Sequence, residues 1–63
     1  MITKLIKIKE VLALTGLSKS HAYALAHKGL FPKPVKLTER SSAWVQAEII
    51  DWIESRIKVR DEG

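Results

Sequence analysis

The stretch TGLSKSHAYALAHKG, residues 15–29, constrains the fold of this 63-residue chain more than any other. Gly16 can adopt the positive φ that ends a preceding helix, and Ser18 is a favoured N-cap residue for the next one. Gly29 supplies a second C-terminal stop, and Lys28 before it suits the negative end of the helix dipole. These residues predict a tight turn followed by a short helix between Ser18 and Gly29.

The predicted helix has a small apolar side and a polar side, given the helical repeat. The apolar residues that share one side are Ala22, Leu25 and Ala26. The residues that point away are Ser20, Tyr23, Ala24 and His27. Two alanines on the inner side allow this helix to lie close against a neighbour. A glycine-containing turn that leads into an outward-facing second helix is the helix-turn-helix pattern, which predicts a DNA-binding domain.

Length and composition limit the chain to one small domain, residues 1–63. A domain of about 60 residues buries only about 60% of its unfolded surface, so we expect modest stability. Cysteine is absent, and the two histidines lack clustered carboxylates, so no disulfide, zinc site or cofactor is expected. No signal peptide is recognisable, and no apolar run approaches about 20 residues. We therefore expect a cytoplasmic protein with no membrane segment.

Charge is distributed unevenly along the chain. Residues 1–40 contain eight Lys and Arg against two Glu, a net charge of +6. Residues 41–63 contain three Lys and Arg against five Asp and Glu, a net charge of −2. A basic front and an acidic back suggest that one side of the protein meets a polyanion. Ordinary solubility is the alternative reading, and charge alone leaves both open.

Residues on either side of the central turn predict the remaining elements of a winged helix. Residues 2–8 read as a short edge strand and residues 9–14 as a first helix of about two turns. Pro32 and Pro34 force extended backbone after the second helix, and Phe31 is expected to anchor the core. Residues 35–37 and 42–44 read as paired strands joined by residues 38–41. A hairpin after a helix-turn-helix is the pattern of a winged helix.

The last predicted element is an amphipathic helix over residues 45–59, followed by a frayed tail at 59–63. Its apolar residues recur at spacings of three and four: Val45, Ile49, Trp52, Ile53 and Ile57. Glu54 and Lys58 are spaced to form an ion pair on the outer side. Trp44 and Trp52 could stack on bases, but their contexts favour core packing. The predicted fold is thus mainly α with a small β-hairpin, a winged helix-turn-helix with a C-terminal helix.

The same residues resemble the AlpA family of prophage and genomic-island regulators over about residues 4–57. The resemblance is carried by TGLS at 15–18, GLFPKPVKL at 29–37, and Ala43-Trp44 with a later Trp52-Ile53. It implies a winged helix related to MerR-type DNA-binding domains. It also implies regulation of an integrase gene, or excisionase action that bends attachment-site DNA.

The chain departs from the family pattern at two places. The family often has Thr-Ile-Tyr-Arg where residues 21–24 read HAYA, so the usual cation at position 24 is missing. The family also tends to have glycines where Thr38 and Glu39 stand. A carboxylate near the wing tip repels phosphate, which opposes deep insertion of the wing into DNA.

Candidate DNA contacts come first from the start of the central helix, which we expect in the major groove. Ser18, with the free amides of Lys19 and Ser20, forms a helix N-terminus that can seat a phosphate, although Ser18 can also be a simple cap. His21 can bond to base edges or be a surface residue, and its ring nitrogens serve either role. His27 lies further from the groove, and the surface reading is favoured there.

The hairpin supplies the second group of candidate contacts, on the DNA backbone or in the minor groove. The guanidinium of Arg40 can enter a narrow minor groove or hold a phosphate through two hydrogen bonds, or it can be a solvated turn residue. Lys33, between two prolines, fits either role. The full set of predicted DNA-binding residues is Ser18, Lys19, Ser20, His21, Tyr23, Lys28, Lys36, Arg40, Ser41 and Ser42.

Enzymatic chemistry has no foundation in the sequence. A glycine-rich phosphate loop, a cysteine nucleophile and a carboxylate pair in a predicted cleft are all absent from the 63 residues, so no enzyme is expected. The alternative is a small protein-interaction module whose last helix grips a regulator or recombinase. An integrase, or another copy of the chain on an adjacent DNA site, is a further expected partner.

Overall fold

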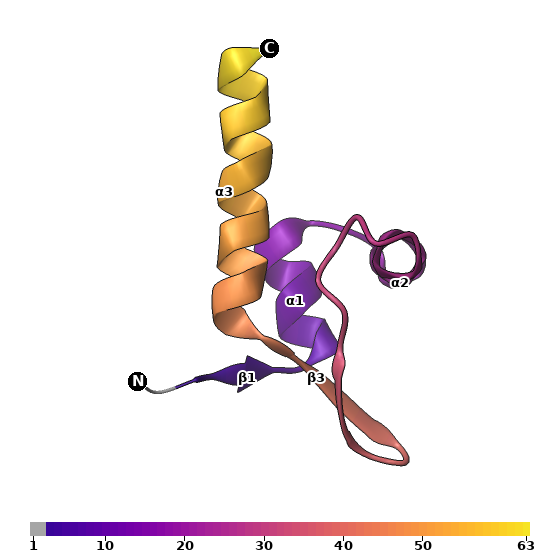
Figure 1. The fold of residues 1–63 in the computed structure, drawn as a ribbon. Helices are drawn as coiled ribbons and strands as arrows, with labels where there is room; N and C mark the ends of the chain where they lie inside the picture. Colours follow the sequence, from indigo (N-terminus) through magenta and orange to yellow (C-terminus); the bar gives the residue numbers. More distant parts are fainter. Residues whose placement is uncertain (1–2) are drawn as a thin grey trace.

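The structure is a computed structural model that describes residues 3–63, and in this part of the chain three helices pack on one side of a small antiparallel sheet (Figure 1). The elements in chain order are β1 Leu5–Ile6, α1 Ile8–Thr15, α2 Lys19–His27, β2 Val35–Thr38, β3 Ser41–Val45 and α3 Gln46–Glu62. The helix α3 and the β2–β3 hairpin extend from the body in opposite directions (Figure 1). Both α2 and the tip of the hairpin lie on the side away from α3.

The turn between α1 and α2 has the backbone that its residues predict. Gly16 has a φ of 75°, and its N–H donates to the carbonyl of Leu12 at 2.8 Å, which ends α1. The hydroxyl of Ser18 accepts a hydrogen bond from the amide of His21 at 3.1 Å. This bond satisfies one of the amides that a helix N-terminus leaves without an intrahelical partner. The predicted stop at Gly16 and the predicted cap at Ser18 are both confirmed.

The C-terminus of α2 ends in a Schellman motif centred on Gly29. Gly29 has a φ of 77°, which only glycine adopts without strain. Its amide donates to the carbonyl of Ala26 at 3.1 Å, and the amide of Leu30 donates to the carbonyl of Leu25 at 2.9 Å. These two bonds satisfy the last carbonyls of the helix and turn the chain toward the sheet. The predicted stop at Gly29 is confirmed.

The sheet has the strand order β1-β3-β2, with both pairings antiparallel. The edge strand predicted over residues 2–8 is confirmed only as Leu5–Ile6, because Ile8 already begins α1; Ile2 lies outside the described residues. The hairpin is longer than predicted, since Thr38 and Ser41 pair with each other and leave a turn of two residues. The wing therefore ends at Glu39 and Arg40.

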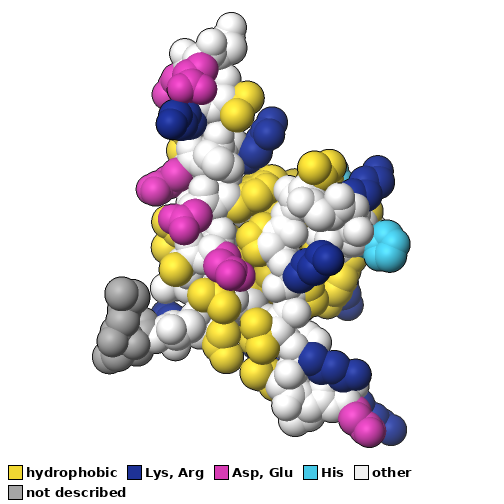
Figure 2. All heavy atoms as spheres, in the orientation of Figure 1, with side chains coloured by type: hydrophobic (Ala, Val, Ile, Leu, Met, Phe, Trp, Pro, Cys, Tyr) yellow, Lys and Arg dark blue, Asp and Glu magenta, His cyan; other side chains and the backbone are white. Residues whose placement is uncertain are grey.

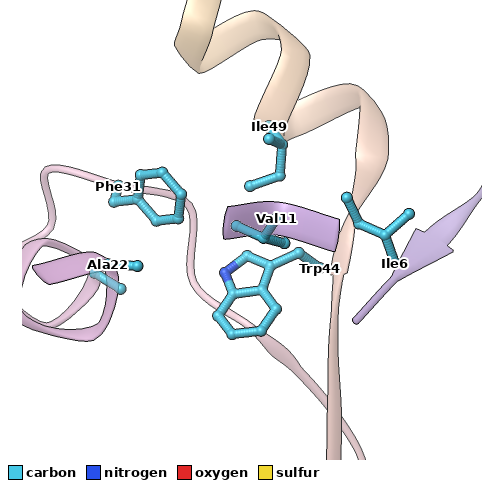
Figure 3. Packing of buried hydrophobic residues seen from close by; sticks show 7 residues of the cluster. Ile6, Val11, Ala22, Phe31, Trp44 and Ile49 are labelled. Atoms are coloured by element: carbon cyan, nitrogen blue, oxygen red, sulfur yellow. The ribbon is translucent and has the colours of Figure 1, made fainter. Parts of the chain in front are cut away.

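Trp44 is at the centre of the hydrophobic core (Figure 3). Trp44, Ile49 and Val11 are fully buried, and Ala22 and Ala26 close the side of α2 that faces them, as the sequence predicts. The indole N–H of Trp44 donates to the carbonyl of Pro32 at 2.9 Å, so the polar atom of this buried ring is satisfied. This hydrogen bond thus fixes the segment between α2 and β2 against the hydrophobic core.

Trp52 fixes the start of the segment between α2 and β2, at Leu30 and Phe31. The indole of Trp52 donates to the carbonyl of Leu30 at 2.8 Å, and its ring meets Phe31 edge-to-face at a centroid distance of 4.8 Å. Phe31 is 4% exposed, so its predicted role as a core anchor is confirmed. Trp52 itself is only partly buried, at the edge of the core.

The helix α3 is longer than the sequence predicts and is packed along only part of its length. It continues through Glu62, and the amide of Gly63 donates to the carbonyl of Val59, so the predicted frayed tail at 59–63 is wrong. Residues 54–62 are all exposed, and Ile57 is 43% exposed. Local i to i−4 hydrogen bonds, uninterrupted by glycine or proline before residue 63, are enough to continue the helix.

The ion pair predicted on α3 does not form. Within residues 3–63, Arg60 and Asp61 make the one ion pair closer than 4 Å, at 2.9 Å, and Glu54 does not pair with Lys58. Both predicted partners are exposed, and an exposed pair gains little over hydration of the separate charges.

Candidate nucleic-acid interface

The outer side of α2 is a continuous exposed surface with no acidic residue. Ser20, Ala24 and His27 follow one another at spacings of four and three, opposite the buried Ala22 and Ala26, and all three are exposed. The small side chains of Ser20 and Ala24 leave the middle of this surface low. A surface of this shape can approach the floor of a major groove closely, because no bulky side chain stands between the helix and the bases.

The predicted reader His21 lies at one edge of this surface. Its side chain lines a hollow between α2 and α3, together with Leu25 and Trp52, and it is exposed. Ser20 is the neighbouring residue that faces directly outward. The first turn of α2 therefore presents a hydroxyl at its centre and an imidazole on the side toward α3.

The opposite edge of α2 is supported by the core. The ring of Tyr23 meets the ring of Trp44 edge-to-face at a centroid distance of 5.6 Å, and Tyr23 remains 40% exposed. A tyrosine in this position has an immobilised ring and an accessible hydroxyl, which is the combination that an oriented hydrogen bond needs. The ring of Tyr23 therefore lies along the edge of α2 that faces Trp44.

The N-terminus of α2 points its first amides outward. Helix geometry leaves the amides of Lys19 and Ser20 without intrahelical acceptors, while Ser18 already serves the amide of His21. The side chain of Lys19 is exposed next to them. Free amides, the positive end of the helix dipole and an ammonium group together suit an anion such as a phosphate.

The wing tip keeps its shape without glycine. In residues 3–63 only Gly16 and Gly29 have positive φ, so the two-residue turn at Glu39 and Arg40 uses ordinary backbone angles. The hydroxyl of Thr38 accepts a hydrogen bond from the amide of Arg40 at 3.3 Å, the local bond typical of a Ser/Thr turn. The side chain of Arg40 is thereby placed at the end of the hairpin and is exposed.

The other predicted DNA contacts of the wing differ in their exposure to solvent. Lys36 is exposed, but Ser41 and Ser42 are half-buried on β3. The hydroxyl of Ser41 accepts a hydrogen bond from the ammonium group of Lys7, a cation that the sequence reasoning left outside the site. No local pattern could have found this contact, because 34 residues separate the two in the chain.

Two further polar residues lie between α2 and the wing. His27 and Lys33 line one hollow with Tyr23, and both are exposed. The sequence favours a surface role for His27 and leaves Lys33 open between a DNA contact and a surface role. The signal that could have found His27 is its spacing of four from Tyr23, whereas Lys33 is brought near only by the turn at Gly29.

Asp and Glu are concentrated on α3, whereas Lys and Arg occur both on α3 and over α2 and the hairpin (Figure 2). Residues 19–45, from the start of α2 to the end of β3, contain five Lys and Arg and one Glu. Five of the seven acidic residues belong to α3. Figure 2 shows Asp and Glu along α3 and mainly Lys and Arg around α2 and the hairpin. The charge that is uneven along the sequence is therefore also uneven in space.

No three His, Asp or Glu side chains of residues 3–63 lie together as metal ligands. None of the helices in that range has the length and apolar character needed to cross a bilayer.

The short turn between α1 and α2, the hairpin after α2 and the basic surface they share define a small winged helix-turn-helix protein. The model of the family described as "Prophage CP4-57 regulatory protein (AlpA)" matches residues 4–57. The chain belongs to this AlpA family of prophage regulatory proteins, as its motifs suggest.

A relative in a phage is similar over nearly the whole chain. "Uncharacterized protein ORF88" of Enterobacteria phage P4 is 38% identical over 60 residues, which cover 95% of this chain and 68% of that protein. The similarity therefore includes both the helix-turn-helix and the wing.

Proposed function

We propose that this protein binds double-stranded DNA at specific sites. In that role it regulates an integrase gene, acts as an excisionase of a prophage or genomic island, or does both. The observation that carries the proposal is the exposed second helix of a helix-turn-helix within a segment, residues 19–45, that has five cations and one carboxylate. Membership of a family of prophage regulatory proteins supports the same function.

The proposed binding mode puts α2 in the major groove and the wing on the backbone or minor groove. Ser20 and His21 read base edges, while Ser18, Lys19 and the first amides of α2 hold a phosphate. Tyr23 and Lys28 contact the backbone beside the groove. The wing contacts come from Lys36, Arg40, Ser41 and Ser42. Glu39 beside Arg40 opposes deep entry into the minor groove, so backbone contact is the favoured mode of the wing.

The test is selection of duplexes from a random-sequence pool, followed by titration of the selected duplex and a scrambled one. We expect one motif to be enriched, and the selected duplex to bind at least tenfold more tightly than the scrambled one. The attachment site and integrase promoter of the element that encodes the protein can then be searched for that motif. Failure to enrich any motif, with no gel shift on any duplex, contradicts the proposal and leaves a pure adaptor.

A second candidate function is contact with a protein partner. It is supported by an exposed apolar surface between the C-terminal end of α1 and the C-terminal half of α3. Leu14 and Ile57 are 44% and 43% exposed and line one hollow there. The proposed occupant is another copy of the chain on an adjacent DNA site, or an integrase. A duplex with two selected sites should bind cooperatively, and Ile57→Glu should remove the cooperativity without changing single-site affinity. Val59→Glu, equally exposed but outside this hollow, is the control.

A further inference from the structure

A hollow of about 460 Å³ lies between α2 and the chain that enters the wing. Its polar lining consists of the hydroxyl-bearing ring of Tyr23, the imidazole of His27 and the side chain of Lys33, and Ala26 and Pro34 complete it. No carboxylate is among the lining residues. All three polar groups can donate hydrogen bonds, and Lys33 adds a positive charge. The hollow is thus suited to an anion with several acceptor oxygens.

The polar groups of the hollow are held in place before any ligand arrives. Trp44 supports two of them: its ring contacts Tyr23, and its indole N–H binds the carbonyl of Pro32, the residue before Lys33. Pro32 and Pro34 restrict the backbone on both sides of Lys33. His27 belongs to the last turn of α2, which the Schellman motif at Gly29 closes. Little backbone freedom remains to be lost on binding, which favours affinity.

The position of the hollow identifies the anion. In the binding mode proposed above, α2 occupies a major groove and the wing follows the neighbouring backbone or minor groove. A sugar–phosphate strand separates any major groove from the adjacent minor groove, so it must cross the protein between α2 and the wing. The hollow lies in that interval, since one wall is α2 and the other is the chain immediately before β2.

We propose that this hollow is a backbone-phosphate site that takes one phosphodiester of the DNA strand separating the two grooves. Lys33 neutralises the charge, while the hydroxyl of Tyr23 and an N–H of His27 bond to the non-bridging oxygens. The inference rests on the proposed function and adds His27 and Lys33 to the residues that contact DNA. A phosphate held there fixes the depth of α2 in the major groove relative to the wing.

The test combines a protein variant with a DNA that lacks one phosphate charge. The selected duplex is prepared as a series in which each phosphate in turn is replaced by a neutral methylphosphonate. Wild-type protein should lose affinity at each phosphate that it contacts, and by about tenfold at the phosphate held in the hollow. Lys33→Gln should show a similar loss on the unmodified duplex and no further loss at that phosphate, because the partner is already missing.

Matched controls separate the hollow from general charge and from folding. Lys58→Gln removes the same charge from α3 and should keep the full loss at that phosphate. Tyr23→Phe removes the hydroxyl but keeps the ring against Trp44, and His27→Phe removes both ring nitrogens but keeps a ring at the same place. Each should weaken both selected and scrambled duplexes about equally, since a phosphate contact has no sequence preference. Thermal unfolding should be unchanged in all four variants, whose altered groups are exposed.

Two results overturn the inference, and they are distinguishable. If wild-type protein binds the selected duplex but Lys33→Gln keeps the full methylphosphonate effect at every phosphate, the hollow does not hold the backbone. The proposed function then stands without it. If wild-type protein binds no duplex at all, the proposed function fails and the phosphate site fails with it.

Discussion

Two regions of the molecule contrast in how they are held and in what charge they display. The α2–wing face, residues 19–45, is a short helix and a hairpin fixed from behind by capping bonds and by two indole hydrogen bonds. The projecting half of α3, residues 54–62, is exposed throughout and held by its own backbone. The first region has a net charge of +4, whereas the second has three cations and three carboxylates.

The contrast shows which part of the chain the hydrophobic core stabilises. A helix of nine residues is marginal in water, so α2 keeps its orientation only through contacts with the core. A helix of 17 residues can extend beyond the core once its first half is anchored. The packing of this small domain is concentrated behind the basic surface, which is the arrangement a preformed DNA-binding face requires. The projecting half of α3 is left available for other contacts.

The largest expected effect is on the support of the α2–wing face. Trp44→Ala should lower the free energy of unfolding by about 3–5 kcal/mol, because it removes a fully buried ring and leaves a cavity between α2 and the sheet. That loss is comparable with the whole stability of a domain this small. Chemical denaturation measures it. Trp52→Ala, from a partly buried position, should lower the free energy of unfolding less, by about 2–3 kcal/mol. Equal losses of stability in the two variants would contradict the expectation that Trp44 contributes more to the core than Trp52.

The next effect concerns salt and compares the charges of the two regions. If four to six cations of the basic front meet phosphates, the slope of log K against log salt should be about −4 to −5. Affinity for the selected duplex should then fall about 250- to 1000-fold between about 50 and 200 mM salt. Fluorescence anisotropy over a salt series gives the slope. Lys58→Gln on α3 should leave it unchanged, and a slope near zero in the wild type would refute DNA binding through this face.

Within the α2–wing face, His21→Ala tests whether this residue contacts a base edge or only the DNA backbone. If His21 bonds to a base edge, its loss should shrink the difference between selected and scrambled DNA by about 1–3 kcal/mol. Parallel titrations of both duplexes measure the change. Since His21 lies at the edge of α2 toward α3, Ser20→Ala is the companion variant. If both variants keep the sequence preference, other residues must contact the base edges.

Arg40→Ala should behave differently from His21→Ala. A phosphate contact from the wing carries no direct sequence information, so selected and scrambled DNA should weaken alike, and the salt slope should fall by about 1. Titration at two salt concentrations measures both quantities. A larger loss on A·T-rich sites would indicate entry into the minor groove. If Arg40→Ala instead erases sequence preference while His21→Ala changes nothing, the roles of helix and wing are reversed.

The smallest expected effect is at the end of α3. Truncation after Val59 removes exposed helix and the exposed Arg60–Asp61 pair, so the free energy of unfolding should change by less than about 0.5 kcal/mol. DNA affinity should also be retained, because residues 60–63 lie beyond the α2–wing face. Denaturation and anisotropy measurements on the truncated chain check both. A large loss of DNA affinity would show that residues 60–63 are part of the binding unit, and a large loss of stability would show that they contribute to folding.

Residue types and their spacing along the chain are enough to predict where α1 ends and where α2 begins and ends. Gly16, Ser18 and Gly29 act through backbone angles and hydrogen bonds within six residues of themselves, so their roles can be predicted from residue type and spacing. The inward side of α2 follows from the positions of Ala22 and Ala26 in the helical repeat. The uneven charge also follows from the chain, because five of the seven acidic residues belong to α3, whereas residues 19–45 contain five cations and one carboxylate. These features sufficed for a winged helix-turn-helix with a basic front.

Contacts between residues that are far apart in the chain depend on how the helices and strands pack in three dimensions. The contact of Lys7 with Ser41, and the hollow shared by His27 and Lys33, depend on how α2 is set against the sheet, which no local pattern records. The periodicity of α3 predicts an apolar stripe that includes Ile57, but it does not show how far along the helix the packing partner of that stripe extends. Ile57 lies beyond that partner and is exposed. The physical reason is range: capping and periodicity are set by neighbours in the chain, whereas burial depends on the position of every other element.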